Sequence, residues 1–476
     1  MSFLSSPVLI GECTNVVASV EQDLDRRMAE DVVSSRSGLE DVQAYRTLNE
    51  AAIAEVRTLV HGLSHTLVST TAQSNGVERL VPLLDEAIER TYRKFYDFVY
   101  ADLPFVWRLL YTDLCLVKVA LLVVGFDSSA GDHAEIEEKL IGEIITTLDR
   151  ALILAGGAGH SRGRKAIIKL LSHLDAPSSA PQSLPDRFPT ARTFAPPVTK
   201  PIKSVENMSM PAFQHYLDSA AHQPLGPEPL ILKGLLTTWP ALTTNPWSSP
   251  RYLLSRTHGG RRLVPVEVGR SYVDEGWTQD LIPFRTLLSR LSASANPAPP
   301  KTYLAQHELF TQLPHLQADV PTPDHTFTAP PGHPTDPSRD KPELPLPLVN
   351  AWFGPAGTIT PLHTDGYHNL LAQVVGAKYL RLYAPHDTEA LCPRAEEDGV
   401  DMSNTSVFDV GVVEGWDEDT QGLDPIELEE FRGLRYWDCV LEEGDVLYIP
   451  MGWWHYVRSL SVSFSVSFWW NGDHAS

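Results

Sequence analysis

Residues 461–470 read SVSFSVSFWW, in which small polar and large apolar side chains alternate up to the closing pair of tryptophans. Successive side chains of a β-strand point to opposite faces of the sheet, so this stretch predicts a strand whose two faces differ. Other short stretches are rich in β-branched or aromatic residues and bounded by Gly, Pro or Asp, among them RLVPVEVG (262–269), NLLAQVV (369–375) and KYLRLYA (378–384). Many short strands with few helices favour an antiparallel barrel or jelly roll over residues 203–476.

The first 175 residues carry the spacing of helices instead. Between residues 134 and 154 apolar side chains recur every three or four positions. They predict one buried stripe beside a charged face, formed by Ile136, Leu140, Ile141, Ile144, Ile145, Leu148 and Leu152. No repeat with a firm period is present, so a repeat-like helical arrangement is left open. The pattern predicts an α+β chain of two parts, with an all-α region at residues 1–175.

Two stretches are dense in proline. Residues 176–202 hold seven prolines in 27 positions, which indicates a linker that is stiff in places and does not pack. Residues 321–347 hold nine prolines. They lie inside the strand-rich part and predict a long surface loop near its functional site.

The charge of the chain is strongly acidic. Its 38 Lys and Arg against 60 Asp and Glu give a net charge of −22, which argues against direct binding to phosphate backbones of nucleic acids. The acid is concentrated between Glu396 and Asp445, where seventeen Asp and Glu face only Arg432 and Arg435. This segment is either a solvated loop or an acidic rim that attracts a basic protein partner.

Cysteine usage and hydropathy point to an intracellular protein. The four cysteines show no CxxC pair and no zinc spacing, which fits a reducing compartment better than a disulfide framework. The most apolar run, residues 114–126, has thirteen residues and contains Lys118, so it indicates a buried helix rather than a membrane span. Residence in the nucleus, the cytoplasm or both is left open, as is the oligomeric state.

A histidine and an aspartate two residues apart stand in the strand-rich part, at His363 and Asp365. The triplet is weak by itself, and a second copy at His173 and Asp175 ends a helical segment and is interpreted as incidental. On an extended strand residues i and i+2 point the same way, so His363 and Asp365 are able to reach one metal ion. With His455 arriving late in the chain, the set is two histidines and a carboxylate, which bind one face of Fe(II) and leave three positions open.

A lysine follows in the same segment. The dipeptide Gly376–Ala377 between two strand-like stretches predicts a two-residue hairpin turn, which would place Val375 opposite Lys378. Asn369, Gln373 and Lys378 would then share one surface with apolar neighbours. An ammonium buried there needs an anion. The alternative is a lysine whose head reaches solvent at a strand end.

The strand-rich part resembles the JmjC domains of the cupin superfamily, and among them the small JmjC protein hydroxylases. The segments that carry the resemblance are YLAQHELF (303–310), NAWFGPAGTITPLHTDGYHNLLAQVVGAKYLRLYAP (350–385), GDVLYIPMGWWHYVRSL (444–460) and SFSVSFWW (463–470). The resemblance implies a double-stranded β-helix over residues 203–476. It departs from the family in the stretch HTDGYHN (363–369), where a more common version runs through proline or glutamine and where His368 adds a further imidazole. On a continuous strand His368 faces away from His363 and is not expected to bind metal.

The resemblance also implies a set of site residues. The iron ligands would be His363, Asp365 and His455. The cosubstrate 2-oxoglutarate would bind through Lys378, Tyr303, Thr360 and Asn369, and O2 would take the remaining metal position. Glu267, Trp277 and Gln306 match positions that hold a target arginine in arginyl hydroxylases, where a carboxylate pairs with the guanidinium and an aromatic face stacks on it. Trp352 and Trp469 are expected in the pocket wall or the core.

The leading hypothesis is therefore an Fe(II)- and 2-oxoglutarate-dependent protein hydroxylase that acts on arginyl side chains of a basic protein or peptide. One alternative is a histone lysine demethylase that uses the same centre, although the sequence has no cysteine-rich zinc module. The other is a catalytically silent cupin that serves as a binding module. Intact metal ligands and Lys378 argue against the silent form.

Overall fold

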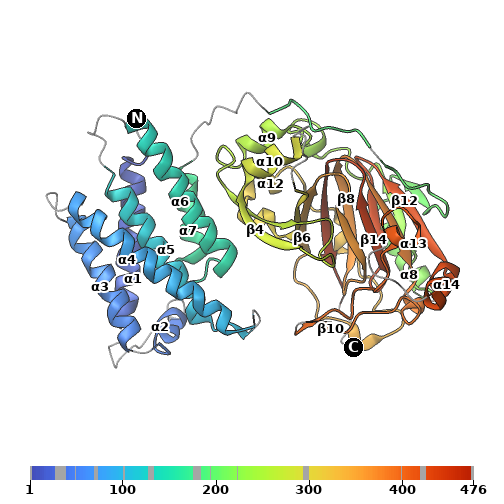
Figure 1. Ribbon diagram of the computed structural model, residues 1–476, viewed down its shortest axis with the longest axis horizontal. Coiled ribbons are helices and arrows are strands. Elements are labelled where there is room, and N and C mark those ends of the chain that lie inside the picture. The colour runs from blue at the N-terminus through green and yellow to red at the C-terminus, as the bar shows by residue number, and fades with distance from the viewer. Residues whose placement is uncertain are drawn as a thin grey trace. The chain divides into compact units, whose positions relative to one another are not determined.

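The computed structural model describes residues 3–26, 39–48, 50–68, 73–99, 102–126, 133–174, 184–192, 194–221, 223–292, 300–397, 399–418 and 425–472. The chain forms two compact units. The first is Met1–Ser179 together with Arg261–Leu263, and the second is Ala180–Gly260 together with Val264–Ser476. Figure 1 shows the first unit as helices and the second as a strand-rich domain with short helices.

The first unit is helical, as predicted. Its helices are α1 (Pro7–Arg26), α2 (Leu39–Tyr45), α3 (Glu50–Val68), α4 (Gln73–Arg93), α5 (Phe105–Val124), α6 (His133–Ala155) and α7 (Gly163–Ser172). Helix α5 is apolar on nearly every face and buried almost throughout, and Lys118 within it is neutralised by Asp85 and Glu143 at 2.7 and 2.8 Å. No helix in the described part of the chain is long and apolar enough to span a bilayer. In α6 the predicted stripe is buried from Ile141 onward, but Ile136 in the first turn is 45% exposed, so this residue was wrongly included.

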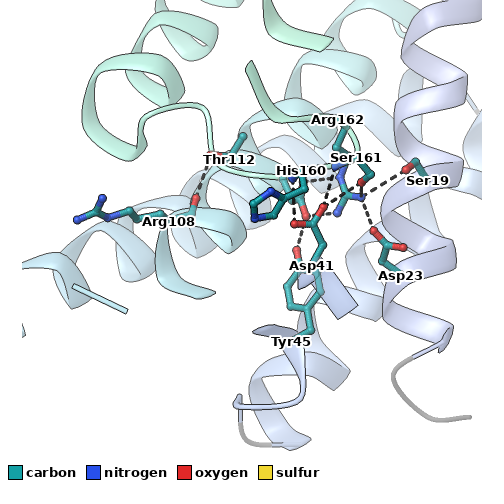
Figure 2. A network of polar contacts seen from close by, with 10 residues as sticks. Ser19, Asp23, Asp41, Tyr45, Arg108, Thr112, His160, Ser161 and Arg162 are labelled. Carbon is teal, nitrogen blue, oxygen red and sulfur yellow. Dashed lines mark hydrogen bonds and ion pairs between the residues drawn. The ribbon is translucent and has the colours of Figure 1, made fainter. Parts of the chain in front are cut away.

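A buried polar network fixes the helices of this unit to one another (Figure 2). The Arg162 guanidinium forms ion pairs with Asp23 of α1 and Asp113 of α5, and the Tyr45 hydroxyl of α2 donates to Asp113. Burial raises the pKa of Asp23, and Arg162 offsets part of that shift. Asp41 accepts hydrogen bonds from the two backbone N–H groups that precede Arg162. Removing Arg162 would leave the buried carboxylates of Asp23 and Asp113 without a partner charge. This destabilises the fold more than replacing the whole ion pair with apolar side chains.

The second unit contains two larger sheets. The nine-stranded sheet has the order β1-β2-β13-β8-β15-β6-β5-β3-β4, and the four-stranded sheet has the order β12-β9-β14-β7. Their strands are β1 (Ser204–Glu206), β2 (Leu230–Lys233), β3 (Leu263–Val268), β4 (Thr278–Pro283), β5 (Thr302–His307), β6 (Leu348–Gly354), β7 (Ile359–His363), β8 (His368–Val375), β9 (Lys378–Tyr383), β12 (Tyr436–Leu441), β13 (Val446–Ile449), β14 (Trp454–Ser459) and β15 (Ser463–Trp470).

Short elements surround these sheets. The helices are α8 (Met210–Ala220), α9 (Pro250–Ser255), α10 (Phe284–Ser292), α11 (Leu309–Gln312), α12 (Pro314–Gln317), α13 (Val410–Val413) and α14 (Pro425–Gly433), and a small ribbon pairs β10 (Glu396–Glu397) with β11 (Val400–Asp401). The predicted helical region followed by a cupin-like β domain is thus confirmed.

Strand β15 has the two different faces that its alternating sequence predicts. Phe464, Val466 and Phe468 belong to the main apolar core. The serines on the other face are buried as well, and they bind polar partners: the Ser465 hydroxyl donates to Gln373 at 2.7 Å, while the Ser467 hydroxyl accepts from the Trp352 indole at 2.9 Å. The polar face therefore points into the domain rather than to solvent.

The predicted hairpin at Gly376–Ala377 is wrong. Strand β8 pairs with β13 and β15, whereas β9 pairs with β12 and β14. The two strands belong to different sheets, so Gly376–Ala377 carries the chain across from one sheet to the other. Gly376 has φ +69°, and a side chain there would meet the carbonyl oxygen of Val462. Glycine fits because this crossing needs the left-handed conformation and a close approach to a neighbouring backbone.

The expectation that the first proline-rich stretch does not pack is also wrong for its described part. Leu184 and Phe188 are 4% exposed and lie in the main core of the second unit. The buried Asp438 carboxylate accepts hydrogen bonds from the backbone N–H groups of Thr199 and Lys200, at 3.1 and 2.7 Å. Residues 184–192 and 194–202 thus form a strap, a segment that packs on the second unit.

We predict that a truncated protein beginning at residue 184 is more stable than one beginning at residue 203. Full burial of a leucine or a phenylalanine contributes about 1.5–3 kcal/mol each, and the shorter form also loses the donors to Asp438. Thermal unfolding of the two purified forms measures the difference. Because both lack the helical unit, the comparison isolates the strap, and equal midpoints would show that the strap contributes nothing.

The acidic segment is partly neutralised by its own domain. Glu414 binds Arg381 at 2.6 Å, Asp417 binds Arg458 at 2.6 Å and Asp445 binds Lys233 at 2.8 Å. Neither predicted form of this segment, a solvated loop or an acidic rim, included these ion pairs within the domain. The segment also pairs with β7 through a backbone bridge between His363 and Thr405, which brings it beside the predicted metal ligands.

Candidate active site

Three residues that could hold one metal ion meet where β7 and β14 pair. His363 ends β7, Asp365 follows two residues later, and the antiparallel register places His455 of β14 opposite His363. The Nε2 atoms of His363 and His455 lie 3.9 and 3.6 Å from the two carboxylate oxygens of Asp365. The candidate ligand atoms all lie within 4.8 Å of one another, as a shared metal ion requires.

Each histidine ring is oriented by a hydrogen bond that its Nδ1 atom forms with a backbone carbonyl. Nδ1 of His363 lies 2.8 Å from the carbonyl oxygen of Pro361, and Nδ1 of His455 lies 3.1 Å from that of Trp453. A carbonyl only accepts, so each Nδ1 carries the proton and each Nε2 presents a lone pair. Burial lowers the pKa of His455 well below its usual value, which keeps that ring neutral and able to bind metal. Burial raises the pKa of Asp365 because it disfavours the charged carboxylate, and a bound cation would lower that pKa again.

A cavity beside these three residues contains Lys378. Its lining also includes Tyr303, Thr360, Asn369 and Trp352. The Lys378 ammonium is 2% exposed and lies 3.3 Å from the Tyr303 hydroxyl, and burial lowers its pKa to about 7. No carboxylate within the described ranges lies at ion-pair distance from it. The buried side-chain oxygen of Asn369 also lacks a hydrogen-bond partner within those ranges. This cavity therefore offers a cation and unsatisfied polar groups to an anionic ligand.

Asn369 and Lys378 reach this cavity from opposite sheets. Asn369 is on β8 of the nine-stranded sheet, and Lys378 begins β9 of the four-stranded sheet. The hairpin predicted at Gly376–Ala377, which would have brought Asn369 and Lys378 together, does not exist. Gln373, which that hairpin placed on the same surface, is outside the lining and bonds instead to Ser463 and Ser465 of β15.

A second cavity opens on the other side of the same residues. Glu267 and Gln306 line it, together with Tyr303, Trp352, Thr360, His363 and Asp365. Gln306 has φ +45° at an irregularity in β5, a strained conformation that occurs most often at functional sites. Burial raises the pKa of Glu267, and the half-buried Trp277 beside it lowers that pKa in part. Trp277 is outside the lining of the cavity itself.

Six residues of this cavity were not anticipated: Tyr272, Ala305, Ile359, Met402, Asn404 and Thr405. Three of them come from the acidic segment, which reaches the cavity by pairing with β7. The Thr364 N–H donates to the carbonyl of Asn404 at 2.9 Å, and the Ser406 N–H donates to that of Leu362 at 2.8 Å. The segment is short and polar there, so no alternating pattern in the sequence announces the pairing.

Comparison with known proteins agrees with this architecture. A model of the cupin-like domain family matches residues 221–476. Lysine-specific demethylase 8 of Danio rerio is 34% identical over 391 residues, which cover 81% of this chain and 86% of the relative. Jumonji C domain-containing protein 5 of Drosophila melanogaster is 32% identical over 401 residues, covering 83% and 88%. Lysine-specific demethylase JMJ30 of Arabidopsis thaliana is 40% identical over 248 residues, covering 52% and 51%.

The chain belongs to the JmjC family of cupin-like oxygenases. Demethylases of the JmjC family in general depend on Fe(II) and 2-oxoglutarate. The residues present fit both groups: two imidazoles and a carboxylate offer ligand atoms within 4.8 Å of one another, and the adjoining cavity contains Lys378, which has no ion-pair partner within the described ranges. The described cysteines lie outside this cluster of metal-binding side chains.

Proposed function

We propose that this JmjC protein binds Fe(II) through His363, Asp365 and His455 and oxidises a cationic side chain of a protein substrate. The observation that carries the proposal is the buried Lys378 ammonium, which lacks an anion within the described ranges and lies in the cavity that adjoins the three ligands. The far carboxylate of 2-oxoglutarate supplies that anion. An ordinary cupin core has no reason to bury an unpaired charge, so a silent binding module fits this site poorly.

The two cavities beside the proposed metal ligands have different roles, one for 2-oxoglutarate and the other for the substrate. Lys378, Tyr303, Thr360 and Asn369 hold the far end of 2-oxoglutarate, and Trp352 is among the residues that line both cavities. Bound iron, 2-oxoglutarate and O2 supply the oxidising chemistry, in which 2-oxoglutarate becomes succinate and carbon dioxide. The protein orients the cosubstrate, shields it from water and presents the target side chain to the metal from the cavity that contains Glu267.

The names of the relatives support demethylation of lysine better than hydroxylation of arginine. The Danio rerio and Arabidopsis thaliana proteins are both called lysine-specific demethylases. We therefore place removal of a methyl group from lysine ahead of the arginyl hydroxylation that the sequence analysis favoured. A methylated ammonium is a cation, so it also fits a cavity that contains an acidic side chain.

Arginyl hydroxylation remains as a second candidate because of one feature of the substrate cavity. Burial raises the pKa of Glu267, and no cation within the described ranges forms an ion pair with it. A carboxylate matches the planar fork of a guanidinium through two parallel hydrogen bonds, which a methylated ammonium cannot form.

Mass spectrometry of peptides separates the two candidates. Methyl-lysine and arginine peptides are incubated with the purified protein, Fe(II) and 2-oxoglutarate. Loss of a methyl group from lysine supports the demethylase, and gain of one oxygen on arginine supports the hydroxylase. Stoichiometric 2-oxoglutarate binding with no oxidation of either peptide class would overturn the proposed function in both forms.

We predict that Glu267→Gln sharply reduces turnover of a cationic peptide and leaves peptide-independent consumption of 2-oxoglutarate intact. Glutamine keeps the size and one acceptor but removes the charge that pairs with the substrate, while the metal ligands and Lys378 are unchanged. Parallel assays of peptide oxidation and succinate formation measure the two effects. Glu275→Gln removes an exposed carboxylate eight residues away and serves as the control. Equal peptide turnover by Glu267→Gln and the parent would make Glu267 a structural residue.

A further inference from the structure

His368 has a place in this site that its sequence position does not reveal. It begins β8 directly before Asn369 and is 1% exposed. Both of its ring nitrogens contact protein atoms outside the three metal ligands. Nδ1 lies 2.8 Å from the Tyr448 hydroxyl and 3.3 Å from the backbone nitrogen of Met451, and Nε2 lies 2.9 Å from the carbonyl oxygen of Pro331.

These partners define one tautomer of the ring. The Pro331 carbonyl only accepts, so Nε2 of His368 carries the proton and donates it. The Met451 N–H only donates, so Nδ1 accepts, and the Tyr448 hydroxyl donates to the same atom. The ring is neutral, and it also stacks on Tyr448 with centroids 5.9 Å apart and planes 9° from parallel. His368 is thus held in one orientation between two segments, the end of β13 with the turn that follows it and the loop that contains Pro331.

The first of these segments is the turn at residues 450–453 between β13 and β14. Met451 is inside this turn, and the two residues that follow contact the metal ligands. The Gly452 N–H lies 3.3 Å from the backbone oxygen of Asp365, and the Trp453 carbonyl accepts the Nδ1 proton of His455 at 3.1 Å. A displacement of Met451 is therefore passed on to Asp365 and to the ring of His455.

The second segment is the proline-rich loop, residues 321–347. Two residues after Pro331, the His333 ring covers the same turn: a Cβ added at Gly452, where φ is +80°, would lie 2.5 Å from Nε2 of His333. The loop thus packs on the outside of the turn, and the bond that His368 donates to Pro331 is one of the hydrogen bonds that place it. His368 joins the loop and the turn.

We infer that His368 is a positioning residue for the metal centre: through Met451 and Pro331 it fixes the turn that orients His455 and Asp365. The inference rests on the proposed function only in taking His363, Asp365 and His455 as metal ligands. Groups that orient ligands from behind contribute about 10- to 100-fold to metal affinity. His368 acts one step further out, so we expect an effect at the lower end of that range.

The test compares two substitutions at this position by titration calorimetry with Mn(II), an oxygen-stable ion that accepts the same ligands. His368→Leu fills the space but neither donates nor accepts, and it should weaken Mn(II) binding about tenfold. His368→Gln offers one amide donor and one acceptor, and it should remain within about threefold of the parent. The turnover of 2-oxoglutarate should follow the same order.

His325→Leu is the matched control. His325 is another buried histidine of this unit, 4% exposed, and it hydrogen-bonds to the Met208 carbonyl at 2.8 Å. Its loss should lower the unfolding temperature and leave Mn(II) affinity unchanged. The inference is overturned if His368→Leu binds Mn(II) as tightly as the parent, or if His368→Gln is as weak as His368→Leu. A parent that does not bind Mn(II) would instead overturn the metal site and the proposed function with it.

Discussion

Replacing His363 or Asp365 with alanine is expected to reduce 2-oxoglutarate turnover to background and to leave the fold intact. His363 and His455 stand on the paired strands β7 and β14, and in the proposed function the ion is catalytic rather than structural. Asp365→Ala should even stabilise the metal-free protein at neutral pH, because burial raises the pKa of Asp365 and ionising it in place has a cost. Succinate formation, Mn(II) titration and thermal unfolding measure the three effects.

The chain contains its own control for this experiment. His173 begins the second His-x-Asp triplet of the sequence, and it lies at the end of α7 in the helical unit. His173→Ala should leave turnover and Mn(II) affinity unchanged. Full activity of His363→Ala or Asp365→Ala with iron present would refute the assignment of these residues as ligands.

Lys378→Met is expected to weaken 2-oxoglutarate binding by about 2–5 kcal/mol, the usual effect of removing one partner from a buried charge pair. That range corresponds to a loss of affinity from roughly 30-fold to several thousand-fold. Calorimetric titration of the Mn(II)-loaded protein measures the change. Lys233→Met, which removes a partly exposed lysine paired with Asp445, is the control. Unchanged affinity in Lys378→Met would remove Lys378 from the cosubstrate site.

The depressed pKa of Lys378 gives this prediction a pH signature. In the ligand-free protein Lys378 loses its proton above about pH 7, so binding of 2-oxoglutarate there requires uptake of a proton. Affinity in the parent should therefore fall as pH rises above 7, by up to about tenfold per pH unit, and this component should vanish in Lys378→Met.

Stability should show the opposite trend. The unfolded chain holds the Lys378 proton up to about pH 10.5 and the folded chain only to about pH 7, so the unfolded state binds more protons between these values. The ligand-free parent thus gains stability from this residue as pH rises through that window, and Lys378→Met should be more stable than the parent near pH 6.

The meeting of His363, Asp365 and His455 was predictable from local patterns. Residues i and i+2 of an extended chain point the same way, which places His363 and Asp365 together although β7 ends at His363, and a strand-like segment late in the chain supplied His455. Pairing partners were not predictable in the same way. Strands β8 and β9 are both short and apolar, and the Gly–Ala dipeptide between them fits a hairpin and a crossing between sheets equally well. Only contacts between residues distant in sequence distinguish the two.

The other differences between prediction and structure also arise from contacts between residues that are distant in sequence. Leu184 and Phe188 are isolated apolar residues in a proline-rich stretch, and nothing local shows that a core will take them in. Thr405 lines the cavity that contains Glu267 because residues 404–406 pair with β7, a contact between segments about forty residues apart. Tyr272 lies in the same lining, with its hydroxyl 3.2 Å from the Thr405 hydroxyl. The composition of the acidic segment indicates its charge but does not reveal the few polar residues through which the segment pairs with β7.

The crossing at Gly376 lets two sheets contribute to one pocket. Asn369 reaches the cavity from the nine-stranded sheet and Lys378 from the four-stranded sheet, so the two groups proposed to hold the far carboxylate of 2-oxoglutarate approach it from opposite sheets. A side chain at Gly376 would press on the Val462 carbonyl, and the chain would have to shift where it passes from one sheet to the other. Substitution of Gly376 is therefore expected to disturb 2-oxoglutarate binding, although Gly376 lies outside the lining of the cavity.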